Sequence, residues 1–210
     1  MLHFTSALHG CSPVDHLLNQ RLLPVVNAVN ALPDSGRHMI AIDGPCGSGK
    51  TTLAACLSRM LNCPCVHMDD FHVPHAQKTA QRMAQPGGNS DRERLICEVL
   101  SPWKQGLPTS YRPYNCSEDC LDASIALPDH TLLILEGSYS HHPEIAAYTS
   151  LQVFVQVNRE EQLQRIRLRS PEKLDMFLSS WIPLEDRYFA AFQLPSSHAI
   201  VIHNHSVQGM

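Results

Sequence analysis

Short apolar runs alternate with amphipathic stretches along most of the chain. The apolar runs are short enough for buried strands, and they lie at 39–42, 65–68, 131–135, 151–157 and 199–202. Helical patterns occupy the segments 49–61, 92–100 and 159–169. Strands that are apolar on both faces and alternate with helices are typical of a parallel sheet covered by helices on both sides. The pattern therefore predicts an α/β fold, a three-layer α/β/α sandwich, in which ligands bind at the carboxyl ends of the strands.

The N-terminal segment, residues 1–36, has a helical pattern of its own. Ser12 as the N-cap and Pro13 in the first helical position predict where this helix begins. Pro24 is predicted to kink or end the helix, and a Pro-Asp-Ser-Gly turn closes the segment. We therefore expect an N-terminal helical extension over 1–36 that packs on a domain over 37–210, with a partner-binding arm as the alternative.

Composition and charge narrow the class of protein. The chain has 210 residues, of which 43% are hydrophobic and 17% charged, as in ordinary compact soluble proteins. A net charge of −4 gives no bulk attraction to nucleic acid or to anionic lipid, so we expect neither as a partner. No apolar run approaches the roughly 20 residues that span a bilayer, and the first residues do not resemble a secretion signal. We expect a cytoplasmic protein with reduced cysteines, and a homo-oligomer remains open.

One motif directly follows the first predicted strand of the core domain. Residues 44–51 match the P-loop (Walker A) pattern of glycine, four residues, then glycine, lysine and serine or threonine. In this pattern successive backbone N–H groups surround phosphate oxygens, the lysine adds a cation, and the hydroxyl can ligate magnesium. We therefore predict a P-loop NTPase fold that binds a nucleoside triphosphate through Gly44, Pro45, Cys46, Gly47, Ser48, Gly49, Lys50, Thr51 and Thr52.

Two further strands are predicted to end in carboxylates. Glu136 follows the apolar run 131–135, where a P-loop protein needs an acid to hold magnesium (Mg2+) or its water shell. Asp69 and Asp70 follow the run 65–68, and one of them can accept the proton of an attacking hydroxyl group. The alternatives are an ordinary acid at a strand end and two solvated turn aspartates.

At these residues the chain resembles the uridine kinase family of P-loop kinases, in its bacterial uridine kinase-like branch. This family includes uridine-cytidine, nicotinamide riboside and phosphoribulose kinases. The resemblance rests on five segments in order: 44–52, 69–71, 89–91, 111–114 and 136–139. It implies that Asp69 is the general base, that Glu136 and Thr51 hold magnesium, and that Asp91 binds acceptor hydroxyl groups.

The resemblance also implies the other acceptor contacts and a lid. The implied acceptor-binding residues are Asp70, Asp91, Tyr111, Arg112, Tyr114 and Tyr188. The segment 165–169 resembles the arginine-bearing lid of the family. Arg165 and Arg169 are four residues apart on a predicted helix and share a face, so we expect both to reach the ATP phosphates on closure, whereas Arg167 points elsewhere. The alternative is a solvated helix on which Glu161 pairs with Arg165.

Together these features predict a kinase that uses ATP and magnesium, with Lys50, Asp69 and Arg169 as its catalytic residues. The expected acceptor is the 5′-hydroxyl of a nucleoside such as uridine. Asp70, Asn115 and Ser170 stand where uridine kinases usually carry serine, aspartate and aspartate, which leaves a sugar or vitamin-precursor acceptor open. A P-loop ATPase or nucleotide switch, and a nucleotide-binding scaffold without turnover, are also compatible with the sequence.

Overall fold

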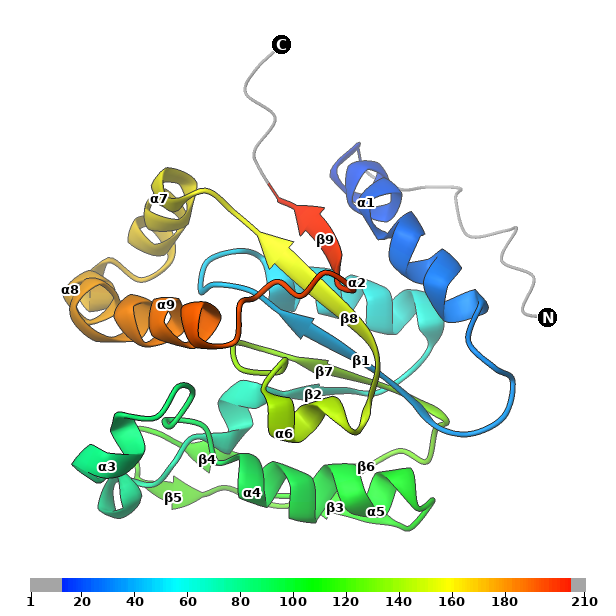
Figure 1. Ribbon diagram of the computed structural model, residues 1–210, viewed down its shortest axis with the longest axis horizontal. Coiled ribbons are helices and arrows are strands. Elements are labelled where there is room, and N and C mark those ends of the chain that lie inside the picture. Colours follow the sequence, from blue (N-terminus) through cyan, green and yellow to red (C-terminus); the bar gives the residue numbers. More distant parts are fainter. Residues whose placement is uncertain (1–12, 205–210) are drawn as a thin grey trace.

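The computed structural model describes residues 13–204 of the chain. Five of the strands form one parallel sheet in the order β2-β7-β1-β8-β9 (Figure 1). These strands are β1 (His38–Asp43), β2 (Cys65–His67), β7 (Leu132–Glu136), β8 (Thr149–Gln156) and β9 (Ile200–His203). Each of them corresponds to one of the apolar runs, so the predicted α/β fold is confirmed.

Strand β1 lies in the middle of the sheet and separates two apolar cores. Its side chains alternate between the two faces, as the two-residue repeat of a strand requires. Ile40 and Ile42 belong to one core, together with Leu57 of α2 (Lys50–Leu61). Met39 belongs to the other core, together with Trp103. Helices therefore cover both faces, and the sheet forms the middle layer (Figure 1).

The predicted helices are present, and one of them is longer than expected. The segment predicted over 92–100 continues to residue 104, because α4 (Arg92–Leu95), a π-helical segment (Ile96–Leu100) and α5 (Ser101–Lys104) follow one another without a break. Helix α7 (Arg159–Arg169) has the predicted bounds. It is followed by α8 (Leu174–Met176), a second π-helical segment (Phe177–Trp181) and α9 (Ile182–Ala191). Helices α7, α8 and α9 lie together at one end of the molecule (Figure 1).

Helix α1 (Pro13–Asn30) continues through Pro24, so of the two predicted effects of this proline an end of the helix is wrong. Proline removes one backbone donor and leaves the carbonyl four residues earlier without a helical partner. Pro24 and Gln20 both lie on the exposed side of α1, where water can bond to that carbonyl. Leu22 and Val25 on the other side are fully buried in the core that contains α2, and this packing supports the helix. The predicted N-cap, Ser12, lies outside the described residues.

Several short elements complete the fold and have no counterpart in the predictions. They are the 3-10 turns Met68–Phe71, His75–Gln77 and Pro171–Lys173, the helices α3 (Ala80–Met83) and α6 (Pro143–Ala146), and the strands β3 (Thr109–Tyr111), β4 (Tyr114–Asn115), β5 (Cys120–Leu121) and β6 (Ile125–Leu127). Strand β3 pairs with β6 and β4 with β5, both antiparallel, beside the main sheet. Strands of two or three residues are too short for a recognisable alternation of apolar and polar positions.

Within residues 13–204, no helix combines the length and the apolar character needed to cross a bilayer.

Candidate functional site

The predicted P-loop connects the end of β1 to the start of α2. Gly44 and Gly49 have φ angles of 147° and 89°, a backbone region that favours glycine. A Cβ atom on Gly44 would lie 2.4 Å from the Val155 carbonyl oxygen, so no larger residue fits there. Gly49 is the N-cap of α2 and provides no side-chain cap, which leaves the first N–H groups of the helix open to an anion.

A buried aspartate that the sequence pattern did not single out anchors the start of this loop. The Asp43 carboxylate accepts hydrogen bonds from the Gly44 N–H at 2.7 Å, from the His141 N–H at 2.9 Å and from the Tyr188 hydroxyl at 2.8 Å. Three donors satisfy a carboxylate that is removed from water. The loop therefore begins at a fixed point of the core.

A cavity of about 420 Å³ lies beside the loop, at the carboxyl ends of β1, β2 and β7. This volume is in the range of small-molecule sites. The predicted site residues that line the cavity are Cys46, Gly47, Gly49, Lys50, Thr51, Thr52, Asp69, Glu136 and Arg169. The structure thus brings the P-loop, one acid from each of the two strand ends and one arginine of the predicted lid to a single space.

Thr51 and Glu136 form a pair of oxygen donors that suits magnesium. The Thr51 hydroxyl lies 3.3 Å from each carboxylate oxygen of Glu136, which is buried. Nδ1 of His67, on the neighbouring strand, lies 2.6 Å from Glu136 Oε1, and this hydrogen bond raises the pKa of His67. Hard oxygen ligands are the ones that magnesium prefers. His67 was not predicted, because its partner is set by the register of β2 and β7.

The two adjacent aspartates have different surroundings. The Asp69 side chain is 88% exposed and lines the cavity, and its closest ionic contact is His72 Nε2 at 4.0 Å. The Asp70 carboxylate accepts a hydrogen bond from the Tyr111 hydroxyl at 2.9 Å, and burial raises its pKa. Of the two, Asp69 is therefore the one placed to meet a ligand in the cavity.

Glu185 of α9 is a further acid in the cavity and was not predicted. Its side chain is buried, with 5% of the residue exposed, and burial raises its pKa. Oε2 accepts a hydrogen bond from the Cys46 N–H at 2.9 Å, and Oε1 accepts one from the Ser138 hydroxyl at 2.5 Å. Burial, followed by the nearby Glu185 carboxylate, raises the pKa of the Cys46 thiol to about 12. A carboxylate of the chain therefore contacts the first part of the P-loop.

The two arginines of the predicted lid have different surroundings. Arg169 lines the cavity, with its guanidinium carbon 5.9 Å from the centre of the Phe177 ring. Arg165 instead lies on the outer side of the P-loop, where it donates to the Ser48 carbonyl at 3.1 Å and to Glu161 at 2.6 Å. The pairing of Glu161 with Arg165, which was the alternative, is thus present. Arg167 is exposed.

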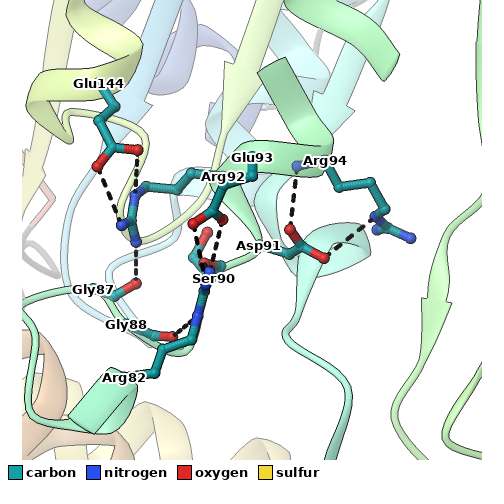
Figure 2. A network of polar contacts seen from close by, with 9 residues as sticks. All are labelled: Arg82, Gly87, Gly88, Ser90, Asp91, Arg92, Glu93, Arg94 and Glu144. Carbon is teal, nitrogen blue, oxygen red and sulfur yellow. Dashed lines mark hydrogen bonds and ion pairs between the residues drawn. The ribbon is translucent and has the colours of Figure 1, made fainter. Parts of the chain in front are cut away.

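The predicted acceptor-binding residues, in contrast, are not brought to the cavity wall. Asp91 caps α4 by accepting from the Arg94 N–H at 3.1 Å and also faces the Arg94 guanidinium (Figure 2). Arg112 donates to the Asp122 carbonyl at 2.6 Å, and Tyr114 to Asp119, so both hold the small antiparallel strands. Tyr111 bonds to Asp70.

Tyr188 requires a plain correction. It was expected to contact the acceptor, but its ring is fully buried in the second core and its hydroxyl is bonded to Asp43. An aromatic side chain without exposed surface cannot form the wall of a binding site. Its place on α9 is instead a packing position, and Glu185 of the same helix is the residue that reaches the cavity.

Asn89 lines the cavity. Arg82 and Arg92 hold the loop on either side of it in place (Figure 2). The buried Arg92 donates to the Gly87 carbonyl at 2.7 Å and pairs with Glu144. Arg82 donates to the carbonyls of the loop residues on either side of Asn89, at 3.0 and 2.9 Å. Arg82 and Arg92 therefore fix the backbone of the loop from which Asn89 reaches the cavity.

Comparison with known proteins agrees with this geometry. The AAA domain family matches residues 40–180, more than half of the chain, and the chain belongs to this family. No curated protein matches it in sequence.

Three solved structures share the fold over nearly their whole length. A possible uridine kinase from Bacillus stearothermophilus has a TM-score of 0.67 and 21% identity, covering 89% of this chain and 99% of that one. A candidate fructose transport system kinase from Silicibacter sp. TM1040 has a TM-score of 0.62 and 18% identity, covering 93% of this chain and 100% of that one. D-glycerate 3-kinase from Cryptococcus neoformans has a TM-score of 0.58 and 13% identity, covering 94% of this chain and 98% of that one. At these identities the likeness shows the fold alone.

Proposed function

We propose that the protein is a kinase that transfers the γ-phosphoryl group of ATP to a hydroxyl group of a small molecule. One observation carries the proposal. The cavity combines a P-loop, a lysine, a pair of magnesium donors formed by Thr51 and the buried Glu136, and an exposed carboxylate, Asp69. A site that binds a triphosphate needs the P-loop, the lysine and the magnesium donors. Transfer to a hydroxyl acceptor needs a carboxylate such as Asp69 in addition.

Each group has a distinct role in this proposal. The open N–H groups at the start of α2 and the Lys50 ammonium bind phosphate oxygens, and Thr51 with Glu136 holds magnesium. When bound, magnesium neutralises charge on the β- and γ-phosphates. Asp69 accepts the proton of the acceptor hydroxyl, and Arg169 stabilises charge that develops on the transferred group.

The acceptor is proposed to be a nucleoside such as uridine, through its 5′-hydroxyl. The resemblance to uridine kinases and the fold shared with a possible uridine kinase support this choice. Asp91, the implied hydroxyl-binding residue, is bonded to Arg94, whereas Asn89 lines the cavity. We therefore assign the hydroxyl contact to Asn89 and keep sugars and sugar acids as further candidates, since two kinases of similar fold carry such names.

The test is ATP consumption by the full-length protein in the presence of magnesium, measured against a panel of nucleosides, sugars and sugar acids. The proposal expects ADP to form in step with one phosphorylated acceptor. The variant Lys50→Ala is the control, and it should lose about a hundredfold or more of that activity because it removes the lysine that stabilises phosphate charge. ATP hydrolysis that no acceptor changes would favour a P-loop ATPase or switch instead.

A further inference from the structure

Two residues that lie outside the segment matched by the AAA domain family are connected to the P-loop by hydrogen bonds. Arg21 belongs to α1, and Asn204 follows the last strand, β9. The Arg21 guanidinium donates to Asn204 Oδ1 at 2.5 Å, and Asn204 Nδ2 donates to the Ser48 carbonyl at 2.7 Å. A chain of two hydrogen bonds therefore connects the N-terminal helix to the nucleotide-binding loop.

Arg21 determines which end of the Asn204 amide faces the loop. A guanidinium group only donates hydrogen bonds, and a backbone carbonyl only accepts them. The amide satisfies both neighbours only with its oxygen toward Arg21 and its nitrogen toward Ser48. The Asn204 backbone is already fixed, because its N–H donates to the Gln156 carbonyl at 2.8 Å. The opposite orientation of the amide would place Oδ1 against the Ser48 carbonyl oxygen and Nδ2 against the Arg21 guanidinium, so Arg21 adds to the preference for the observed one.

The orientation of the Ser48 carbonyl matters because it determines the direction of the Gly49 N–H, which can donate a hydrogen bond to a phosphate. In a trans peptide the C=O of one residue and the N–H of the next point in opposite directions. Asn204 and Arg165 hold the Ser48 carbonyl on the outer side of the loop, at 2.7 and 3.1 Å. The Gly49 N–H consequently points the other way, and Gly49 lines the cavity. A Cβ atom on Gly49 would lie 2.5 Å from Asn204 Nδ2, so glycine is what allows this close contact.

We propose that Arg21, acting through Asn204, is a positioning residue for the P-loop, so that the N-terminal helix sets the affinity for nucleotide. This inference rests on the nucleotide binding that the proposed function requires, and it does not depend on the identity of the acceptor. It gives residues 13–30 a role in the site that is separate from their role in the core.

The test is calorimetric titration of the full-length protein with ADP and with ATP, each in the presence of magnesium. Arg21→Ala should weaken the binding of both nucleotides by about three- to tenfold, which is the loss of affinity expected for one hydrogen bond. Arg21→Lys keeps a donor and should recover part of the affinity. Arg59→Ala removes the same charge from the exposed far end of α2 and should leave both affinities unchanged.

The decisive comparison is made in an Asn204→Ala background. If Arg21 acts through Asn204, adding Arg21→Ala there should cause no further loss of affinity. An undiminished effect in that background, or wild-type affinity in the Arg21→Ala single variant, would overturn the inference while leaving the kinase proposal intact. Absence of nucleotide binding by the wild-type protein would overturn both.

Discussion

Asp69 and Asp70 are neighbours in the sequence, yet they are expected to differ in what they contribute. Asp69→Asn should lower kcat by roughly 10²- to 10⁴-fold while the affinity for ATP is retained, because it removes only the proton acceptor. Asp70→Asn is the matched control. Its carboxylate faces Tyr111 rather than the cavity, so its kcat should stay within a few fold of wild type. Steady-state kinetics with the acceptor found in the panel, together with nucleotide titration, measures both. The opposite order of losses would move the role of base to Asp70.

Glu185 is expected to lower the stability of the fold at neutral pH. Burial raises its pKa above the ordinary value of 4.5, so the folded protein binds this proton more tightly than the unfolded chain does. The protonated Glu185 side chain therefore makes its full contribution to the free energy of unfolding below pH 4.5. This contribution is lost as the pH rises through the pKa of Glu185 in the folded protein. Glutamine does not titrate.

Glu185→Gln should accordingly unfold at a higher temperature than wild type at pH 7 to 8, and the difference should shrink as the pH falls toward 4.5. Thermal unfolding followed by circular dichroism over this pH series measures the effect. The exposed Glu118→Gln is the control and should show no such trend. A midpoint difference that is constant with pH would contradict the assignment of a raised pKa to Glu185.

The site residues that could be predicted from the sequence are those whose functional partners lie within a few positions of them in the chain. The P-loop is contiguous, so its glycines, Lys50 and Thr51 carry their pattern within a few positions. His67, Glu185 and Asn204 reach the site from other strands and helices, and nothing in their own segments indicates a partner. The predicted acceptor-binding residues do not line the cavity for a related reason. A resemblance transfers residue types, but whether a tyrosine such as Tyr188 faces a cavity or a core depends on packing.

At the scale of elements, the long helices and apolar strands could be predicted, because they repeat their pattern often enough. The short strands β3 to β6 could not, since two or three residues show no repeat. The continuation of α1 through Pro24 shows the opposite case, in which a local rule is overridden. Packing of Leu22 and Val25 on α2 and the sheet stabilises a helix whose proline lies on the solvent side.

The facing of side chains on α7 gives a prediction for the element as a whole. Arg169 and Arg167 are both exposed, but of the two it is Arg169 that lines the cavity. An arginine that meets charge developing on the transferred phosphoryl group should contribute more to the transition state than to the bound ground state. Arg169→Ala should therefore depress kcat and kcat/KM together, by about 10- to 1000-fold, with little change in the dissociation constant for ATP. Arg167→Ala should do much less, and a larger loss there would refute the facing of α7.

At the scale of the molecule, the sheet joins the cores on its two faces, and α1 belongs to the first of them. Its residues lie outside the matched segment 40–180, so the family alone would not place them in the fold. The division of the chain at residue 36 stays a prediction about domains. The packing argues that the helix and the sheet unfold together, since both bury the same apolar surface.

Two adjacent leucines of α1 test this. Leu22 is fully buried against the core of β1 and α2, whereas Leu23 is 52% exposed. Leu22→Ala should lower the free energy of unfolding by about 2 to 5 kcal/mol, from lost apolar burial and the cavity left behind. Leu23→Ala is the same substitution in the same helix and should change the free energy of unfolding by about 0.5 kcal/mol or less. Denaturant unfolding followed through the far-UV signal and through tryptophan fluorescence should give one shared transition for Leu22→Ala. Equal losses in the two variants, or a separate early transition of α1, would mean that the N-terminal helix is only attached to the surface.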